Sequence, residues 1–448
     1  GKGKDQISFD QVDINDAVDY AAADADLTFR LFKLFQPLIK EKKLDDLFYN
    51  IELPTQHCLA LMEREGVSID DAYLGDLEKE FQEKVRGLSE EIYTLSGSNF
   101  NINSPKQLAE VLFDNLEIPV VKKTKTGRST DSFVLEKLKK DYSIAEKLLD
   151  YRTLEKLQGT YVKALPELIN TATNRIHTSF NQTIAITGRL SSTKPNLQNI
   201  PIRSEDGMRI RAAFVPSRKD GYILSVDYSQ IELRMMAHFS EDDNMVKAFC
   251  DDLDIHTATA ALIYDVDLND VTKEQRYNAK AVNFGISYGQ SAFGLSETIG
   301  VSRKEAKEII DSYFIKFPKL QLFMDNTIKE AHQKGCITTM FGRIRPLPEL
   351  NEPRQRQFGE RMAVNTRVQG SAAEIMKIAM VNIMNKMVES KMQSRMVIQV
   401  HDELVFDIHP DEKEVMDKLV RTEMEHAITL KVPLKVDAVF GKNWQEIS

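Results

Sequence analysis

The sequence has 448 residues, enough for about three domains, and 68 acidic against 59 basic residues give a net charge of −9. This balance does not favour a polyanionic partner, so any surface for nucleic acid has to come from local clusters of cations. The three cysteines are far apart and outside any CxxC motif, which argues against a disulfide framework or a zinc site. No apolar segment is long enough to cross a membrane and the N-terminus is not a signal peptide, so we expect an intracellular, reduced protein.

Residues 49–175 are predicted to be helical and elongated. Apolar residues from Leu74 to Ile92 recur every three or four positions, with Ser68 suited to the helix start and Gly97 to its end. About 24 residues at 1.5 Å each would form an arm of roughly 36 Å, long enough to lie beside a duplex. The apolar stripe favours a packing seam over a partner-binding coiled coil.

Two polar segments are predicted to be loops. Residues 122–128 contain four cations and no acid, and residues 187–201 are rich in short polar side chains with few helix formers. A run of cations is usually a solvated loop, and this is the favoured interpretation of the first segment by itself.

Two aspartates directly follow short apolar runs. Residues 222–226 are predicted to form a buried strand that delivers Asp227. Residues 396–400 are predicted to form another strand, which turns at residues 401–403, including Asp402 and Glu403, and returns through 404–406. If the two tips meet, their carboxylates would repel one another unless protons or divalent cations lie between them. Hard oxygen ligands of this kind favour magnesium or manganese over zinc.

Residues 272–289 are predicted to begin as a helix with a capping box. Arg276, Lys280 and Phe284 recur every fourth residue, which places two cations and an aromatic ring on one stripe. Such a stripe can hold a triphosphate and offer a flat face to a base. A solvated basic face with Phe284 in the core explains this segment equally well.

On these motifs, which occur in the family's order, the chain resembles the family A DNA polymerases of the bacterial large-fragment type over essentially its whole length. The resemblance implies an α+β right-hand fold with an antiparallel palm sheet, helical fingers, a helical thumb and a remnant of a 3′–5′ exonuclease domain. The implied boundaries are 1–48 for the exonuclease remnant, 49–175 for the thumb, 176–240 for the first part of the palm, 241–345 for the fingers and 346–448 for the second part of the palm.

The N-terminal segment resembles the last exonuclease motif at Tyr20 and Asp24, and both are expected to be helical. The other exonuclease carboxylates are absent from the sequence. Because that hydrolysis needs a cage of several carboxylates and metal ions, no proofreading is expected from this chain.

The implied activity is template-directed extension of a primer 3′-hydroxyl with dNTPs, assisted by two Mg²⁺ ions for which Mn²⁺ is expected to substitute. The resemblance implies that Asp227, Asp402 and the backbone carbonyl of Tyr228 bind the metals and that Glu403 is a nearby catalytic acid. Lys280 is expected to protonate the departing pyrophosphate.

Further residues carry over from the family's motifs. Glu232 is expected to exclude a ribose 2′-hydroxyl. The implied nucleotide-binding set is Arg276, Lys280, Phe284, Tyr288, Glu232, Gln230 and His256. The implied DNA-binding set is Arg152, Lys156, Arg189, Asn196, Gln198, Arg203, Arg361, Asn365, Gln369 and His401.

Three rival functions are less consistent with the sequence. A single-subunit phage-type RNA polymerase would need space where Glu232 stands, and a catalytically silent DNA-binding module would be expected to lack Asp227 or Asp402. A surviving nuclease conflicts with the incomplete exonuclease carboxylates. We expect a monomer that binds primer–template DNA and dNTPs and no membrane, in the cytoplasm at the nucleoid.

Overall fold

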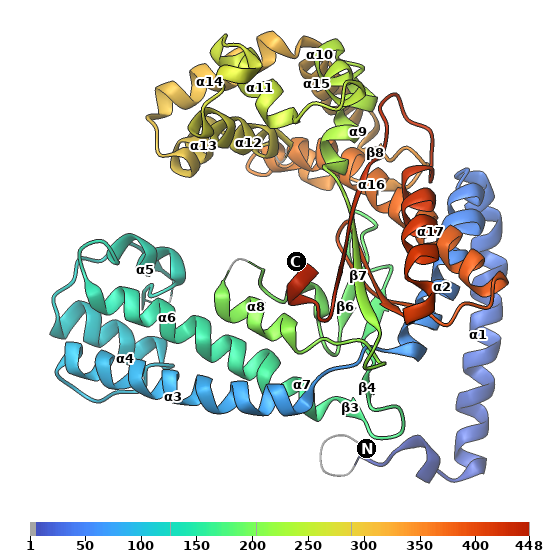
Figure 1. The fold of residues 1–448 in the computed structure, drawn as a ribbon, viewed down its shortest axis with the longest axis horizontal. Coiled ribbons are helices and arrows are strands. Elements are labelled where there is room, and N and C mark those ends of the chain that lie inside the picture. Colours follow the sequence, from blue (N-terminus) through green and yellow to red (C-terminus); the bar gives the residue numbers. More distant parts are fainter. Residues whose placement is uncertain (1–5, 126, 203, 288, 448) are drawn as a thin grey trace.

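A computed structural model describes residues 6–125, 127–202, 204–287 and 289–447. A four-stranded antiparallel sheet, in the order β10-β11-β7-β12, lies at its centre with helical groups on different sides (Figure 1). The strands of this sheet are β7 (Tyr222–Tyr228), β10 (Arg395–Val400), β11 (Glu403–Ile408) and β12 (Val436–Gly441).

The predicted acid-bearing strands are confirmed, with one correction at β7. The strand continues past residue 226 because Asp227 pairs with Glu403 on one side and with Asp437 on the other, so Asp227 lies within the strand. The hairpin between β10 and β11 turns at His401 and Asp402, where His401 adopts a φ of 54°. Strand β12 was not predicted; it contains the apolar run Ala438–Phe440, but alternate residues of it are exposed.

Because side chains alternate along each strand, the sheet has one apolar face and one acidic face. Leu224 and Val226 of β7 belong to the large core that also contains helix residues of α9 (Ile231–Ser240) and α16 (Arg356–Glu389). Successive side chains of a strand point to opposite faces, so Ser225 and Asp227 lie on the other face. That second face meets the helical group that follows residue 70, through Ile223.

The first helical group contains the predicted long helix, α3 (Asp71–Ser96). Its C-cap residue Gly97 has the expected left-handed φ of 67°, whereas the N-cap is Asp70, whose carboxylate accepts from Tyr73 N at 2.9 Å. The other elements of this group, in chain order, are α4 (Pro105–Glu110), η4 (Val111–Asn115), α5 (Ser132–Leu138), α6 (Ser143–Leu157), η5 (Gln158–Val162), α7 (Ala164–Glu167) and α8 (Glu205–Ala212).

The two predicted loops contain short ordered elements. The basic segment forms a hairpin of β1 (Lys123–Thr124) and β2 (Gly127–Arg128), held by a two-bonded Arg128–Asp114 ion pair. The polar segment before β7 contains a strand and a 3-10 turn. The remaining small elements here are β3 (Ile169–Asn170), β4 (Arg175–Ile176), β5 (Ser179–Asn181), β6 (Ser191–Thr193) and η6 (Leu197–Asn199).

A second helical group is inserted between β7 and β10 and lies at the top of Figure 1. The capping box predicted at Thr272 is present, since Thr272 N donates to Gln275 Oε1 at 2.9 Å and Gln275 N to Thr272 Oγ1 at 3.2 Å. The group contains α10 (Asp243–Cys250), α11 (Ile255–Tyr264), η7 (Leu268–Asp270), α12 (Lys273–Ser287), α13 (Ala292–Ile299), α14 (Arg303–Lys316), α15 (Pro318–Lys334), β8 (Cys336–Thr338), β9 (Ile344–Pro346) and η8 (Pro348–Asn351).

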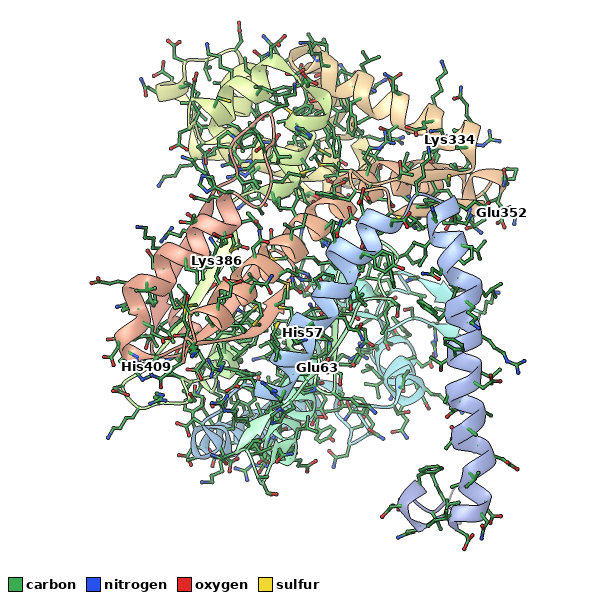
Figure 2. All side chains as sticks on the ribbon, turned by 90° about the vertical axis from the view of Figure 1, so that its right-hand side faces the viewer. His57, Glu63, Lys334, Glu352, Lys386 and His409 are labelled. Atoms are coloured by element: carbon green, nitrogen blue, oxygen red, sulfur yellow. The ribbon has the colours of Figure 1, made fainter. Side chains whose placement is uncertain are left out.

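The N-terminal helix α1 (Ile14–Glu41) lies at the edge of the molecule in both views and has no buried side chain (Figures 1 and 2). Tyr20 and Asp24 are helical, as expected. Helix α2 (Leu53–Glu65) carries the labelled His57 and Glu63 in Figure 2 and packs on α16. The other terminal elements are η2 (Phe9–Gln11), η3 (Asp46–Glu52), η9 (Pro410–Glu412), α17 (Lys413–Glu425) and η10 (Gln445–Ile447).

Candidate active site

The acids that follow the apolar runs meet on one face of the sheet. Glu403 and Asp437 are the direct cross-strand partners of Asp227, and Asp402 joins the cluster through its carbonyl oxygen, which accepts from Tyr228 N at 3.1 Å. Burial raises the pKa of the Asp227 carboxyl, and the charges of Asp402, Glu403 and Asp437 raise it further. The pKa of Asp402 is also raised, chiefly by burial. These aspartates therefore gain from a proton or a cation between them.

The donor types at this face fit a hard divalent cation. Asp227 and Asp402 supply carboxylate oxygens and Tyr228 supplies a backbone carbonyl at the end of β7. Within the described parts of the chain, no three His, Cys, Asp or Glu side chains are already arranged to enclose an ion. The fit therefore rests on two aspartates and backbone oxygen, the set that the resemblance implies.

Glu403 is held by two donors from different elements. The Ser225 hydroxyl donates to Glu403 Oε1 at 2.6 Å, and the indole N–H of Trp444 donates to the same oxygen at 3.2 Å. Trp444 follows β12 and is completely buried. Sequence inspection missed it because no motif surrounds this residue, although it is the only tryptophan in the chain.

Beside the acids, Glu232 and Arg189 form an ion pair. Arg189 Nη2 lies 2.5 Å from Glu232 Oε1, and Glu232, in the first turn of α9, is 9% exposed. Gln230 is the N-cap of the same helix and has a φ of 56°. Arg189 and His401 also line a small crevice together, so three residues predicted from separate segments lie near one another.

The stripe on α12 has two cations at the surface and a ring that is partly covered. Arg276 makes two hydrogen bonds to Asp254, from Nε at 3.1 Å and from Nη2 at 2.8 Å, and Lys280 is exposed one turn later. The Phe284 ring lies 5.6 Å from the ring of His256. This arrangement is intermediate between the two interpretations of the stripe, because Phe284 is neither exposed nor fully buried.

His256 differs from the expectation that it offers a nitrogen to phosphate. It is 3% exposed and its Nδ1 lies 3.0 Å from Asn283 Nδ2. Burial lowers the pKa of His256 to about 4, so the ring is neutral at physiological pH. In this arrangement His256 is a packed residue behind Phe284, and binding a phosphate would require it to move.

The residues expected to bind DNA are spread over several elements, and Arg152, Asn196 and Gln198 make hydrogen bonds within the protein. Arg152, which was expected to project toward DNA, is turned inward and donates to Thr130 O, while Lys156 on the same helix is exposed. The Asn196 side chain caps η6 by accepting from Gln198 N at 3.0 Å. Gln198 donates to Gln399.

Helix α16 carries three more expected DNA contacts, Arg361, Asn365 and Gln369, spaced four residues apart on one face. Arg361 and Asn365 line a cavity of about 310 Å³ between α16, α15 and the segment after α12. Two other expected residues, Tyr288 and Arg203, lie outside the described residues.

A buried ion cluster was also missed from the sequence. Lys377 is 1% exposed and its Nζ donates to Glu52 Oε1 at 2.7 Å, while Arg343 bonds both Glu52 and Glu374. Gly188, the neighbour of Arg189, lies against the Arg343 side chain so closely that a Cβ there would be 2.5 Å from Arg343 Nε. The cluster therefore supports the loop that carries Arg189. Its members come from distant segments, so no local spacing could have indicated it.

Comparison with known proteins gives consistent matches along the chain. The family model described as DNA polymerase family A matches residues 71–446. DNA polymerase I of Geobacillus stearothermophilus is 48% identical over 421 residues, covering 93% of this chain and 48% of that protein. DNA polymerase I of Pseudomonas aeruginosa is 47% identical over 452 residues, covering 100% of this chain and 49% of that protein.

A solved structure is also similar. The POL domain of Pol1 from M. smegmatis, in complex with DNA primer-template and dNTP, superposes with a TM-score of 0.86 at 41% sequence identity. The match covers 91% of this chain and 72% of that one. The chain spans about half the length of the curated relatives it matches.

Proposed function

Because the chain belongs to DNA polymerase family A, we propose that it is a template-directed DNA polymerase that extends a primer 3′-hydroxyl with dNTPs and releases pyrophosphate. The observation that carries the proposal is the register of β7 and β11, which sets Asp227 opposite Glu403 and beside Asp402. Helix α12, with Arg276 and Lys280, packs on α9, which follows directly on β7.

The proposal assigns a different structural role to each part of the chain. Residues 49–175 act as the thumb and residues 241–345 as the fingers, while 176–240 and 346–448 together form the palm around the sheet. Residues 1–48 are assigned to an exonuclease-like domain. The similarity to the solved structure supports the polymerase fold as a whole. In this chain, no helix among the described residues is long and apolar enough to span a bilayer.

Family A polymerases use divalent metal ions, and we assign two Mg²⁺ ions, replaceable by Mn²⁺, to Asp227, Asp402 and the Tyr228 carbonyl. Such ions, when bound, activate the attacking hydroxyl and neutralise charge on the leaving group. The raised pKa values of Asp227 and Asp402 support the assignment, because two partly buried carboxylates this close need a compensating positive charge.

The chain's own cations have a distinct part in the proposed reaction. Arg276 and Lys280 bind the triphosphate, and Lys280 donates a proton to the pyrophosphate as it departs. Phe284 and Tyr288 contact the incoming base and the templating position, with Gln230 and His256 as further nucleotide contacts. For Arg276 to reach phosphate, its ion pair with Asp254 has to open, since both of its bonded nitrogens face that carboxylate.

Glu232 gives the proposal its sugar specificity. We assign its buried side chain the role of excluding a ribose 2′-hydroxyl by its bulk, and the ion pair with Arg189 supports this role by holding the carboxylate in place. Glu403, close to both aspartates, completes the acidic site.

Primer–template DNA is the proposed macromolecular partner, and the enzyme is proposed to act as a monomer. Arg189 and His401 are assigned to the primer end, where a donor in the minor groove meets an acceptor in every correct base pair. Phosphate and minor-groove contacts of this kind add affinity without sequence preference. The other assigned contacts are Lys156, Asn196, Gln198, Arg203, Arg361, Asn365 and Gln369, with Arg152 included only if it turns away from Thr130.

Extension of a labelled primer on a template is the direct test. The wild-type chain should add dNTPs with Mg²⁺, and Asp402→Asn should be slower by on the order of 10²–10³-fold, the loss expected when one preorganised charge is removed at the reacting centre. Equal rates for the two proteins would overturn the assignment. Degradation of the primer without nucleotides would instead indicate a nuclease.

A further inference from the structure

Glu403 is held more firmly than its neighbours in the acidic cluster. Its Oε1 accepts from Ser225 Oγ at 2.6 Å and from Trp444 Nε1 at 3.2 Å. Ser225 belongs to β7 and Trp444 to the segment after β12, so donors from two different elements converge on one oxygen. The other carboxylate oxygen, Oε2, is not the acceptor of either bond.

The Trp444 ring is itself fixed on its other sides. The Arg211 guanidinium lies 4.1 Å from the ring centroid, and the Phe214 ring meets it edge-on at 5.2 Å. Arg211 is 1% exposed and Trp444 is fully buried. Both contacts are made with the aromatic ring, and the indole N–H remains bonded to Glu403 Oε1.

A phenylalanine would fill most of this space without a polar group. A buried indole N–H needs a hydrogen-bond partner, and here the partner is a carboxylate beside Asp227 and Asp402. Groups that orient a carboxylate next to a metal site commonly change metal affinity by 10–100-fold when they are altered.

We propose that Trp444 and Ser225 are positioning residues that hold Glu403 as an outer partner of the divalent cations bound by Asp227 and Asp402, and that the Trp444 indole reports their binding. The inference rests on the proposed metal site. Glu403, held through Oε1, keeps Oε2 to accept from metal-bound water and does not become a third direct ligand.

Manganese titration of the protein alone, followed by the electron paramagnetic resonance of free Mn²⁺, tests the proposal without DNA, nucleotide or turnover. Trp444→Phe and Glu403→Gln should each weaken binding by about 10-fold, the lower end of the range for residues that orient metal ligands. Phe214→Leu disturbs packing on the same indole and keeps its N–H, so its binding should equal that of the wild type. An equal loss in Phe214→Leu would show that packing alone matters and would overturn the proposal.

Ser225→Ala provides a second, smaller change if Trp444→Phe does not fold. It removes one donor to the same oxygen and should also weaken Mn²⁺ binding, by several-fold. Wild-type affinity in both Ser225→Ala and a folded Trp444→Phe would refute the positioning role.

Tryptophan fluorescence gives an independent readout because the chain contains a single tryptophan. Mg²⁺ should shift the indole emission of the wild type, and Glu403→Gln should lose most of this response. An unchanged response in Glu403→Gln would contradict the reporter role. In primer extension, excess Mg²⁺ should restore the rate of Trp444→Phe, which it would not do for damage to the fold.

Failure of the metal site itself has a different signature. If the wild-type chain binds no Mn²⁺, or if Asp402→Asn binds it equally well, the proposed metal site is wrong. If Asp402→Asn loses binding while Trp444→Phe retains it, only the inference about Trp444 is wrong.

Discussion

Glu232 combines bulk and charge at a nearly buried position, and the two properties can be separated by mutation. Glu232→Ala removes the side chain that would meet a 2′-hydroxyl, and it should reduce discrimination between dATP and ATP by roughly 10²-fold. Glu232→Gln keeps the bulk and weakens the bond to Arg189, so it should retain most of the discrimination. Ratios of kcat/KM on one primed template measure both, and unchanged selectivity in Glu232→Ala would contradict the gate assignment.

His256 should make the fold sensitive to acid. Burial lowers its pKa from 6.5 to about 4, so the unfolded chain binds more protons than the folded one between these values. Stability from this residue is fully present above pH 6.5 and is lost as the pH falls toward 4, by up to about 3 kcal/mol. Urea unfolding across this range should show a weaker pH dependence for His256→Asn than for the wild type. Identical curves would mean that His256 is not buried in solution.

Residue types predicted the centre of the site better than its surroundings. Asp227, Asp402 and Glu403 could be assigned because each stands at the end of an apolar run, a local pattern. Trp444 and Lys377 could not, because their partners Glu403 and Glu52 are remote in sequence and no spacing connects them. His256 and Arg152 were expected to contact ligands, but His256 is buried and Arg152 bonds to Thr130. Whether a side chain is exposed depends on tertiary packing, which a single sequence does not contain.

At the scale of elements, helices α11 and α12 are joined by the pair of Arg276 and Asp254. Asp254→Asn should loosen this pair and keep the cap on α11, because an asparagine oxygen can still accept from Thr257 N. Because Asp254 then competes less for Arg276, dNTP should bind up to about fivefold more tightly. This gain corresponds to the free energy of one exposed ion pair. Pre-steady-state measurement of the dNTP Kd would check this. Weaker binding in Asp254→Asn would mean that Asp254 orients Arg276 for the nucleotide.

Two helical glycines should respond to alanine in opposite directions. A Cβ at Gly370 of α16 would lie 2.6 Å from Thr339 Cγ2 and 3.0 Å from Thr187 O, so Gly370→Ala should cost about 1–3 kcal/mol. Gly87 of α3 has nothing within 4 Å of such an atom, and Gly87→Ala should stabilise the fold by up to about 1 kcal/mol. Chemical denaturation compares them directly, and a loss at Gly87 would contradict the open space there.

Elements with a strong local pattern were predicted well. The spacing of apolar residues predicted α3, and the capping box predicted the start of α12. Strand β12 and the pair of strands β1 and β2 were missed, because their order comes from pairing with neighbours and from the Arg128–Asp114 contact.

For the molecule as a whole, α1 contributes little to the packed core. It has no buried side chain, and several of its phenylalanines, including Phe29 and Phe32, are at least half exposed. Deleting residues 1–41 should therefore change Tm by less than about 2 °C and leave primer extension intact. Calorimetry and extension assays would check both. A large fall in Tm would show that α1 packs against the protein in solution.

The resemblance predicted the family, and the comparisons confirm it. Domain boundaries and individual site roles stay predictions, because they depend on contacts with DNA and nucleotide. Composition alone pointed away from nucleic acid, since a net charge of −9 conceals how cations are distributed over the surface.

The register of β7 between β11 and β12 has a consequence for how such chains can diverge. A single inserted residue in β7 would turn Asp227 to the apolar face of the sheet and separate it from Glu403 and Asp437. The long excursion between β7 and β10 can change length at a cost that grows only logarithmically. Insertions and deletions among homologues should therefore accumulate in that excursion and be purged from the strands.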